Sequence, residues 1–219
     1  VGIGDKIWTV KWNSDATKLY FGCERSILSN PKSYAIYSPN EAANATQTLS
    51  SGATINSSRG TIDDAVAVAG TGNVISGSPS FSEGITLNDA SAELTLQMTS
   101  KLDANLALGS GTVILGSDLS MADGYVLTGD GKVDFDGKSF HLPGAPSTWT
   151  SSINMYNAGD IELHSYTTLS GIWYFSGGQE TGGNINGNGN VLDLSSGGTI
   201  RIDGKHSLLL ADVFVKGIG

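Results

Sequence analysis

The chain has 219 residues, of which 39% are hydrophobic and only 15% are charged, and this composition excludes an intrinsically disordered protein. The formal net charge of −9 argues against nucleic acids and anionic membranes as partners, because both bind basic surfaces. Cys23 is the single cysteine, so an intrachain disulfide and a cysteine-based metal site are excluded, and we expect a small buried apolar residue there. No apolar run approaches the roughly 18 residues that span a bilayer, and no membrane insertion is expected.

The glycine content predicts a chain of short strands joined by turns. There are 30 glycines against 5 prolines, a ratio that favours ordered turns over a low-complexity linker. Val1 at the start indicates a processed chain or a fragment. Together with the scarcity of cysteine, it leads us to expect a secreted protein, extracellular or at the cell surface.

Residues 1–40 are expected to form a small antiparallel β segment. Ile7–Trp12 and Leu19–Gly22 read as two strands around a turn-rich loop, and Tyr34–Tyr37 as a third. The pattern weakly resembles one blade of a WD-type propeller, but a propeller needs at least about four blades to close. We therefore expect a small sheet that packs on the rest of the chain or on a partner, followed by a polar linker over 41–60.

Residues 61–219 carry internal repeats. The motif G-x-G-[NK]-V recurs at Gly70–Val74, Gly129–Val133 and Gly187–Val191, at spacings of 59 and 58 residues. Apolar pairs at i and i+2 recur within this period at steps of 20, 19 and 20 residues. Their starts are Val74, Leu94, Val113 and Val133. Pro143–Thr150 breaks the phase and is interpreted as an insertion between coils.

This spacing predicts a solenoid. Residues at i and i+2 of a strand share one face, and strands this short bury that face only when successive coils stack in register. The predicted fold is all-β, a parallel β-helix with coils of about twenty residues behind a small N-terminal antiparallel β segment. An antiparallel β-sandwich, with turns every 8 to 12 residues, is the alternative.

Gly129–Gly137 fits the pattern GxGxIDGxG closely, and Leu208–Gly217 fits the pattern LTLxNVxIKG. These segments resemble coils of the right-handed parallel β-helix superfamily, which includes pectate-lyase-like enzymes, autotransporter passengers and adhesins. Residues 61–69 resemble the short helix that caps the first coil, with Thr61 as its N-cap. The resemblance covers roughly residues 60–219. It implies a right-handed solenoid, but it does not point to one particular activity.

Carboxylates are the candidate catalytic groups. Asp130, Asp134 and Asp136 lie close together, and β-helix hydrolases use clustered aspartates for acid and base work. The sequence lacks the Gly-His-Gly and Arg-x-Lys segments of the polygalacturonase-like set, so solvated turn carboxylates are the favoured interpretation. Tandem nonapeptide calcium repeats are also missing, and no metal or cofactor is expected.

Aromatic residues in and after the insertion are candidates for stacking on sugar rings. The alternative is that they fill an irregular part of the core. They are Trp149, Tyr156, Tyr166, Trp173 and Tyr174.

An open coil presents unpaired strand edges, so either the native chain continues beyond the last coil or this end docks on something. The ends of the solenoid are therefore candidates for self-association. Strands around Trp8 and Trp12 of one copy would add to the C-terminal coil of another. The C-terminal candidates are Leu208, Leu210, Val213 and Val215. The leading hypothesis is a non-enzymatic extracellular structural or adhesive protein that assembles end to end into a fibre. The rival is a polysaccharide-acting or carbohydrate-binding protein.

Overall fold

The computed structural model describes the backbone of residues 7–12, 19–23, 46–58, 60–177, 181–204 and 207–217. Side chains are described for residues 46–58, 60–177, 183–204 and 207–217. Every regular element in these ranges is a strand, so the described residues hold no helix that could span a membrane. The predicted strand at Tyr34–Tyr37 and the side chain of Cys23 lie outside them.

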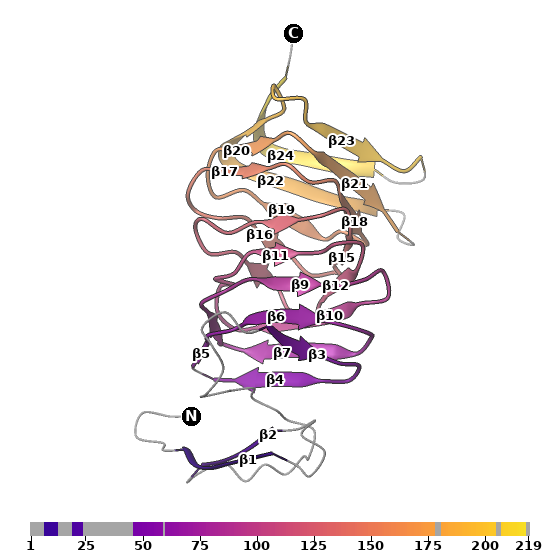
Figure 1. Ribbon diagram of the computed structural model, residues 1–219. Coiled ribbons are helices and arrows are strands. Elements are labelled where there is room, and N and C mark those ends of the chain that lie inside the picture. The colour runs from indigo at the N-terminus through magenta and orange to yellow at the C-terminus, as the bar shows by residue number, and fades with distance from the viewer. Residues whose placement is uncertain are drawn as a thin grey trace.

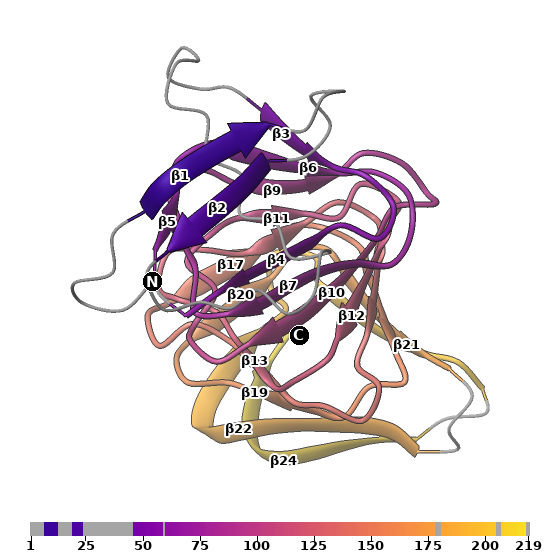
Figure 2. The ribbon, with the colours of Figure 1, turned by 90° about the horizontal axis from the view of Figure 1, so that it is seen from below.

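The N-terminal segment is antiparallel, as predicted. β1 (Ile7–Trp12) pairs with β2 (Leu19–Cys23), with Val10 opposite Phe21. Figures 1 and 2 both show this pair lying across the first coil of the main body. β1 carries Trp8 and Trp12, whose side chains lie outside the described set.

The main body is a parallel β-solenoid whose strands stack on three faces (Figures 1 and 2). The first face, here the long sheet, has eight strands and therefore marks eight coils. Its strands in stacking order are β4 (Thr54–Ser57), β7 (Asn73–Gly77), β10 (Glu93–Met98), β12 (Thr112–Leu115), β15 (Lys132–Asp134), β18 (Ile153–Tyr156), β21 (Ile172–Ser176) and β23 (Thr199–Ile202).

The other two faces merge towards the C-terminus. The second sheet stacks β3 (Thr46–Leu49), β6 (Ala65–Val68), β9 (Ile85–Leu87), β11 (Leu106–Ala107) and β14 (Leu127–Thr128). The third sheet holds β13 (Leu119–Ser120), β16 (Phe140–His141), β19 (Asp160–Glu162), β17 (Ser147–Trp149) and β20 (Thr167–Leu169), joined by the long β22 (Thr181–Asp193). β24 (Ser207–Lys216) pairs with β22, and β5 (Thr61–Ile62) pairs with β8 (Ser80–Phe81). All these pairings are parallel, which confirms the predicted solenoid and excludes the sandwich.

Inward side chains form columns along the axis. In the long sheet one column gives one residue per coil, and each of its members is at most 1% exposed. Its members are Leu94, Val113, Val133, Met155 and Phe175. The predicted spacing is confirmed for the first three of them. Burial of such apolar columns is the main stabilising term of the fold.

Val74 is not in this column, and the predicted phase is wrong there by one residue. Asn73 pairs with Leu94 and is fully buried, whereas Val74 is half-buried on the other side of the strand. The Asn73 side-chain amide donates to the carbonyl oxygens of Ala69 (3.2 Å), Gly70 (3.1 Å) and Glu93 (3.3 Å). Its oxygen accepts from the Ala53 amide at 3.2 Å. A buried amide thus ties one turn to the coils on both sides.

The 59-residue repeat does not continue through the third motif copy. The first two copies of the motif each run into a strand of the long sheet: Gly70–Val74 into β7 and Gly129–Val133 into β15. Gly187–Val191 lies instead inside β22, on the third sheet. The reason is a change in coil length: Phe175 pairs with Ile202, a step of 27 residues, where Leu94 and Val113 are 19 apart.

The solenoid begins earlier than predicted, and the capping helix predicted over 61–69 is wrong. Residues 46–57 of the expected linker already form β3 and β4. Ala65–Val68 forms β6, stacked between β3 and β9, with Val66 and Val68 at most 1% exposed. Alternating β-branched residues fit a pleated surface, and pairing on both sides overrides the helix start signal at Thr61.

The expected insertion, Pro143–Thr150, belongs to the coil. Its residues include β17, and Trp149 lies in the core at 1% exposure. Edge-to-face contacts run from Phe135 through Phe140 and Trp149 to Trp173, with ring centroids 6.3, 6.0 and 6.0 Å apart. The Trp149 indole donates to Ser147 Oγ at 3.1 Å, while the buried Nε1 of Trp173 has no partner among the described residues. The C-terminal half of the core is therefore filled by large rings in geometries that aromatic pairs prefer.

Candidate functional site

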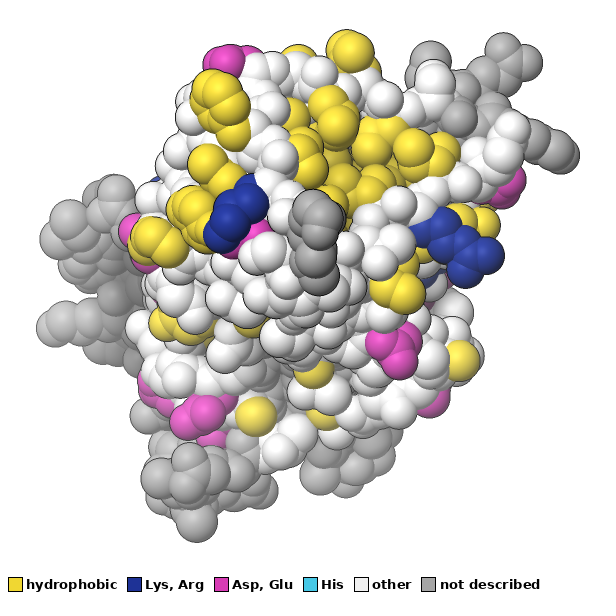
Figure 3. Space-filling view, turned by 90° about the horizontal axis from the view of Figure 1, so that it is seen from above, with side chains coloured by type: hydrophobic (Ala, Val, Ile, Leu, Met, Phe, Trp, Pro, Cys, Tyr) yellow, Lys and Arg dark blue, Asp and Glu magenta, His cyan; other side chains and the backbone are white. Residues whose placement is uncertain are grey.

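The last coil presents an open apolar surface, here called the C-terminal tip. It is formed by β23 and β24, and Figure 3 shows hydrophobic side chains gathered on this end of the molecule. Ile202 (41%), Leu210 (45%) and Val215 (46%) lie exposed on its inner side, above the core. Leu209 (59%) and Phe214 (65%) lie exposed on the other side of β24. Contiguous apolar exposure of this kind marks interaction surfaces in soluble proteins.

Several tip residues continue the core columns by one layer. Ile202 pairs with Phe175, Leu210 pairs with Ile185, and Val215 pairs with Leu192 in the coil below. The three lower residues are fully buried, whereas the three upper ones are between 41% and 46% exposed. The tip therefore has the side-chain arrangement of the core, and no described residue forms a coil above it.

The backbone at the tip is also open. Among the described strands, β23 is the end strand of the long sheet and β24 pairs with β22 alone. An end strand leaves one row of amide and carbonyl groups unpaired by the sheet, and this row is a template for a further strand. The tip thus offers both apolar contact and backbone hydrogen bonding.

A polar cluster holds β24 in place. Asp193, at the end of β22, is 5% exposed and forms an ion pair with Lys216 of β24 at 2.8 Å. Its carboxylate also accepts the hydroxyl of Tyr166 and the amide of Ser195, the latter at 2.8 Å. Lys216, and then these hydrogen bonds, hold the pKa of Asp193 well below its usual range, and Asp193 raises the pKa of Lys216.

The first coil is closed by comparison. Leu49 of β3 and Ile55 of β4 are 1% and 3% exposed, although they belong to an end coil. Figure 2, seen from that end, shows β1 and β2 crossing in front of the stack. The two ends of the solenoid therefore differ, and the C-terminal end alone shows large exposed aliphatic residues among the described side chains.

The sequence identified only part of the tip. Leu210 and Val215 are exposed, while Leu208 and Val213 are half-buried. Phe214 (65%) and Leu209 (59%) are more exposed still and were not predicted; they lie between the predicted positions on β24. Self-association through these residues stays a prediction.

The three candidate aspartates lie at the end of β15 and in the turns on either side of it. Asp134 accepts from the Asp136 amide (3.3 Å) and the Asn157 side chain (3.3 Å), and its other oxygen lies 3.9 Å from Lys132 Nζ. Asp136 has a φ of 46° in the exposed turn that follows, and Asp130 is exposed in the turn before β15. These contacts are those of turn and strand-end carboxylates.

The predicted sugar platform is wrong for both tryptophans. Trp149 and Trp173 are at most 1% exposed and cannot stack on a ligand. Tyr156 and Tyr174 lie half-buried on the outer face of the long sheet, where Lys132 and Arg201 sit over their rings at 4.5 and 5.5 Å from the centroids. Because cations occupy these ring faces, the structure gives carbohydrate stacking little support.

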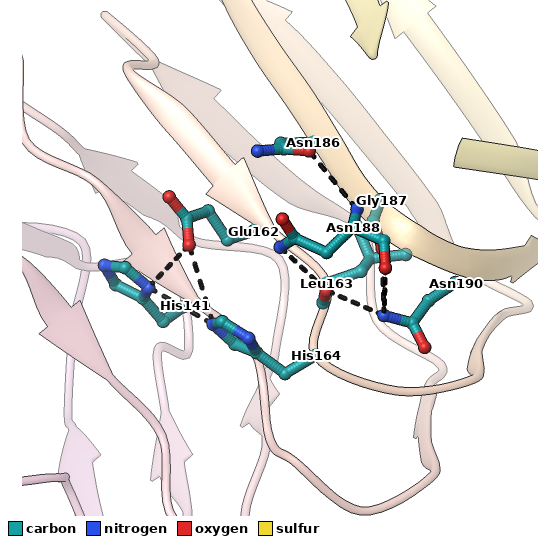
Figure 4. A network of polar contacts seen from close by, with 8 residues as sticks. All are labelled: His141, Glu162, Leu163, His164, Asn186, Gly187, Asn188 and Asn190. Carbon is teal, nitrogen blue, oxygen red and sulfur yellow. Dashed lines mark hydrogen bonds and ion pairs between the residues drawn. The ribbon is translucent and has the colours of Figure 1, made fainter. Parts of the chain in front are cut away.

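Sequence analysis missed a cluster on the third sheet. His141 of β16 pairs in register with Glu162 of β19, and His164 follows two residues later on the same side of the chain (Figure 4). The Glu162 Oε2 atom lies 3.1 Å from His141 Nδ1 and 3.6 Å from His164 Nε2. The signal was present: His141 and Glu162 are 21 residues apart, which is one coil step.

Comparison with known proteins yields no relative. No family model, no curated protein and no solved structure matches the chain. The functional reading therefore depends on the structure itself.

Proposed function

We propose that this protein is a non-enzymatic structural solenoid that associates end to end. The C-terminal tip of one copy is covered by a second copy, which supplies the missing layer over Ile202, Leu210 and Val215. The observation that carries the proposal is the 41–46% exposure of these three residues directly above fully buried column partners. At roughly 25 cal/mol per Å² of apolar area, covering such a layer is a strong drive for association.

The difference between the two ends favours head-to-tail contact. Two identical tips would pair into a closed dimer, whereas a tip that meets the opposite end of the next copy builds a fibre. β1 and β2 lie at that opposite end, and their strands are available to extend β23 or β24. The proposal assigns Trp8 and Trp12 of β1 to the contact.

A fibre of this kind fits an extracellular or surface location and an adhesive role. The acidic, low-charge chain and the Gly129–Gly137 motif support kinship with right-handed pectate-lyase-like and autotransporter-passenger β-helices. Both the location and the kinship are part of the proposal. The rival, binding or cleavage of polysaccharide, is not favoured by the ring contacts of Tyr156 and Tyr174.

The test is assembly as a function of concentration, followed by light scattering and electron microscopy. The wild-type chain is expected to form rods that lengthen with concentration. The Leu210→Lys/Val215→Lys variant is expected to stay monomeric, because two charges replace the apolar layer. The Thr86→Lys/Gln97→Lys variant is the matched control, since it adds the same charge at exposed positions of middle coils. A wild-type chain that is strictly monomeric at high concentration refutes the proposal.

A second variant separates the two geometries. Trp8→Ser/Trp12→Ser is expected to stop rod growth if the contact is head to tail. Dimers that persist in this variant, without any longer species in the wild type, would show tip-to-tip pairing and overturn the fibre.

A further inference from the structure

We propose that His141, Glu162 and His164 bind one divalent transition-metal ion of the Zn²⁺ type on the outer face of the third sheet. Among the described residues, these three bring their ligand atoms within 4.8 Å of one another. The proposal is independent of end-to-end association, because the cluster lies on β16 and β19 and not at the tip.

The distances between the ligand atoms suit a metal. The separations are 3.1 Å from Glu162 Oε2 to His141 Nδ1, 3.6 Å from Glu162 Oε2 to His164 Nε2, and 3.3 Å between the two nitrogens. A tetrahedral ion with bonds of about 2.0–2.2 Å places its ligands about 3.3–3.6 Å apart. The three atoms therefore stand close to the corners of a tetrahedral face before any ion binds.

The ligand types select the class of ion. Two imidazole nitrogens and one carboxylate oxygen suit Zn²⁺ and its neighbours Cu²⁺ and Ni²⁺. Ca²⁺ takes six to eight oxygen ligands, and Mg²⁺ prefers oxygen in octahedral geometry, so both are poor fits. The sequence predicted no metal because it has no cysteine pair and no tandem acidic repeat. The present ligands are two histidines and one glutamate, which belong to neither pattern.

The backbone that carries the ligands is held rigidly. The Leu163 carbonyl, between Glu162 and His164, accepts the side-chain amides of Asn188 (3.2 Å) and Asn190 (3.1 Å), as Figure 4 shows. The Leu163 amide donates to the Asn186 carbonyl of the next coil at 2.9 Å. Leu163 itself is fully buried, so its neighbours on either side are directed outwards. Supporting bonds of this kind keep a metal site in its binding geometry.

The site is open to solvent on one side. His141 and His164 also line a groove of about 330 Å³, together with Lys101, Ser120, Met121, Leu142 and Gly144. Three protein ligands leave at least one position of a tetrahedral ion vacant, and the groove gives water access to it. Side-chain exposures of 26%, 27% and 41% for His141, Glu162 and His164 permit entry of the ion without unfolding.

Titration calorimetry of the metal-free chain with ZnCl₂ tests the proposal. One ion per chain is expected, with CaCl₂ and MgCl₂ giving no comparable binding at the same concentrations. His164→Ala and Glu162→Gln are each expected to weaken Zn²⁺ binding at least about tenfold, since loss of even an outer partner costs this much. Co²⁺ in place of Zn²⁺ is expected to give the intense visible absorption of a four-coordinate ion in the wild type and to lose it in both variants.

Two matched controls define the refuting results. Glu83→Gln makes the same chemical change in an exposed turn, and His206→Ala removes the third histidine of the chain. Both are expected to bind Zn²⁺ as the wild type does, and circular dichroism in EDTA checks that all variants are folded. Zn²⁺ binding that is unchanged in folded His164→Ala and Glu162→Gln, or no binding in the wild type, would show that the cluster is only an ion pair.

Discussion

Replacement of Asn73 by alanine is the sharpest test of the register of the solenoid. The structure places this amide, and not Val74, in the long-sheet column beside Leu94. Its side-chain nitrogen has two hydrogens and three carbonyl acceptors within 3.3 Å, so two full donated bonds are lost. Asn73 Oδ1 also accepts a bond from the Ala53 amide, but losing this bond is expected to cost less free energy of unfolding. The Ala53 amide keeps a second acceptor, the Ser50 carbonyl at 3.0 Å.

The expected cost follows from this count. At about 1 kcal/mol per bond, with some buried carbonyls left unpaired, Asn73→Ala is expected to lower the free energy of unfolding by about 2–3 kcal/mol. For a chain of this size that is a fall in Tm of roughly 4–12 °C. Calorimetry or urea unfolding measures it. Val74→Ala is the control and is expected to cost less than about 1 kcal/mol, because Val74 is half-buried on the outer side. If Val74→Ala costs more than Asn73→Ala, the register argument is refuted.

Three further predictions concern the C-terminal half. Asp193→Asn removes the ion pair with Lys216, so β24 is expected to detach more often at neutral pH. Hydrogen exchange would show this as faster exchange of the β24 backbone amides. In the wild type the lowered pKa of Asp193 means that its stabilisation is present above the ordinary value of 3.8 and is lost as pH falls from there through the pKa of the folded state. Protection of the β24 amides, corrected for the intrinsic pH dependence of exchange, is therefore expected to fall between pH 6 and 3, and unchanged protection would contradict this. Trp173→Phe is expected to destabilise the fold by about 1 kcal/mol less than Trp149→Phe, since only the latter loses an indole hydrogen bond, and equal losses in urea unfolding would count against the assignment. Gly171→Ala is expected to cost about 1–3 kcal/mol in the same assay, because a Cβ there collides with the Ser151 carbonyl oxygen, and a neutral result would show that the coils are packed less closely.

The middle of the solenoid was predictable because its signal is local. Leu94, Val113 and Val133 recur at one coil step, and stacking converts that step directly into a buried column. The prediction erred where pairing between coils decides the structure. Thr61 followed by two aspartates looks like a helix start, but β6 is fixed by strands on both sides, which a single segment does not reveal.

The third sheet and its site were harder to foresee. His141 and Glu162 come together only because their strands stack in register, and that register depends on the extra residues in the coil between them. Gly187–Val191 shows the same limit, since an identical motif falls on another sheet once the coil length changes. A sequence motif records residue types only. The site depends on the number of residues in each coil, because that number decides which residues of neighbouring coils pair.

Each coil is bonded only to the coils above and below it. Under a pulling force the coils are therefore expected to unfold in order from the end that is pulled. A pull on the C-terminus acts first on β24, which is held by one strand and by the contact of Asp193 with Lys216. Once that contact gives way, the next coils are released one at a time, each adding about 70 Å of extended chain for its roughly twenty residues. Tension would thus be relieved in steps, and a molecule stretched part of the way would keep its remaining coils intact.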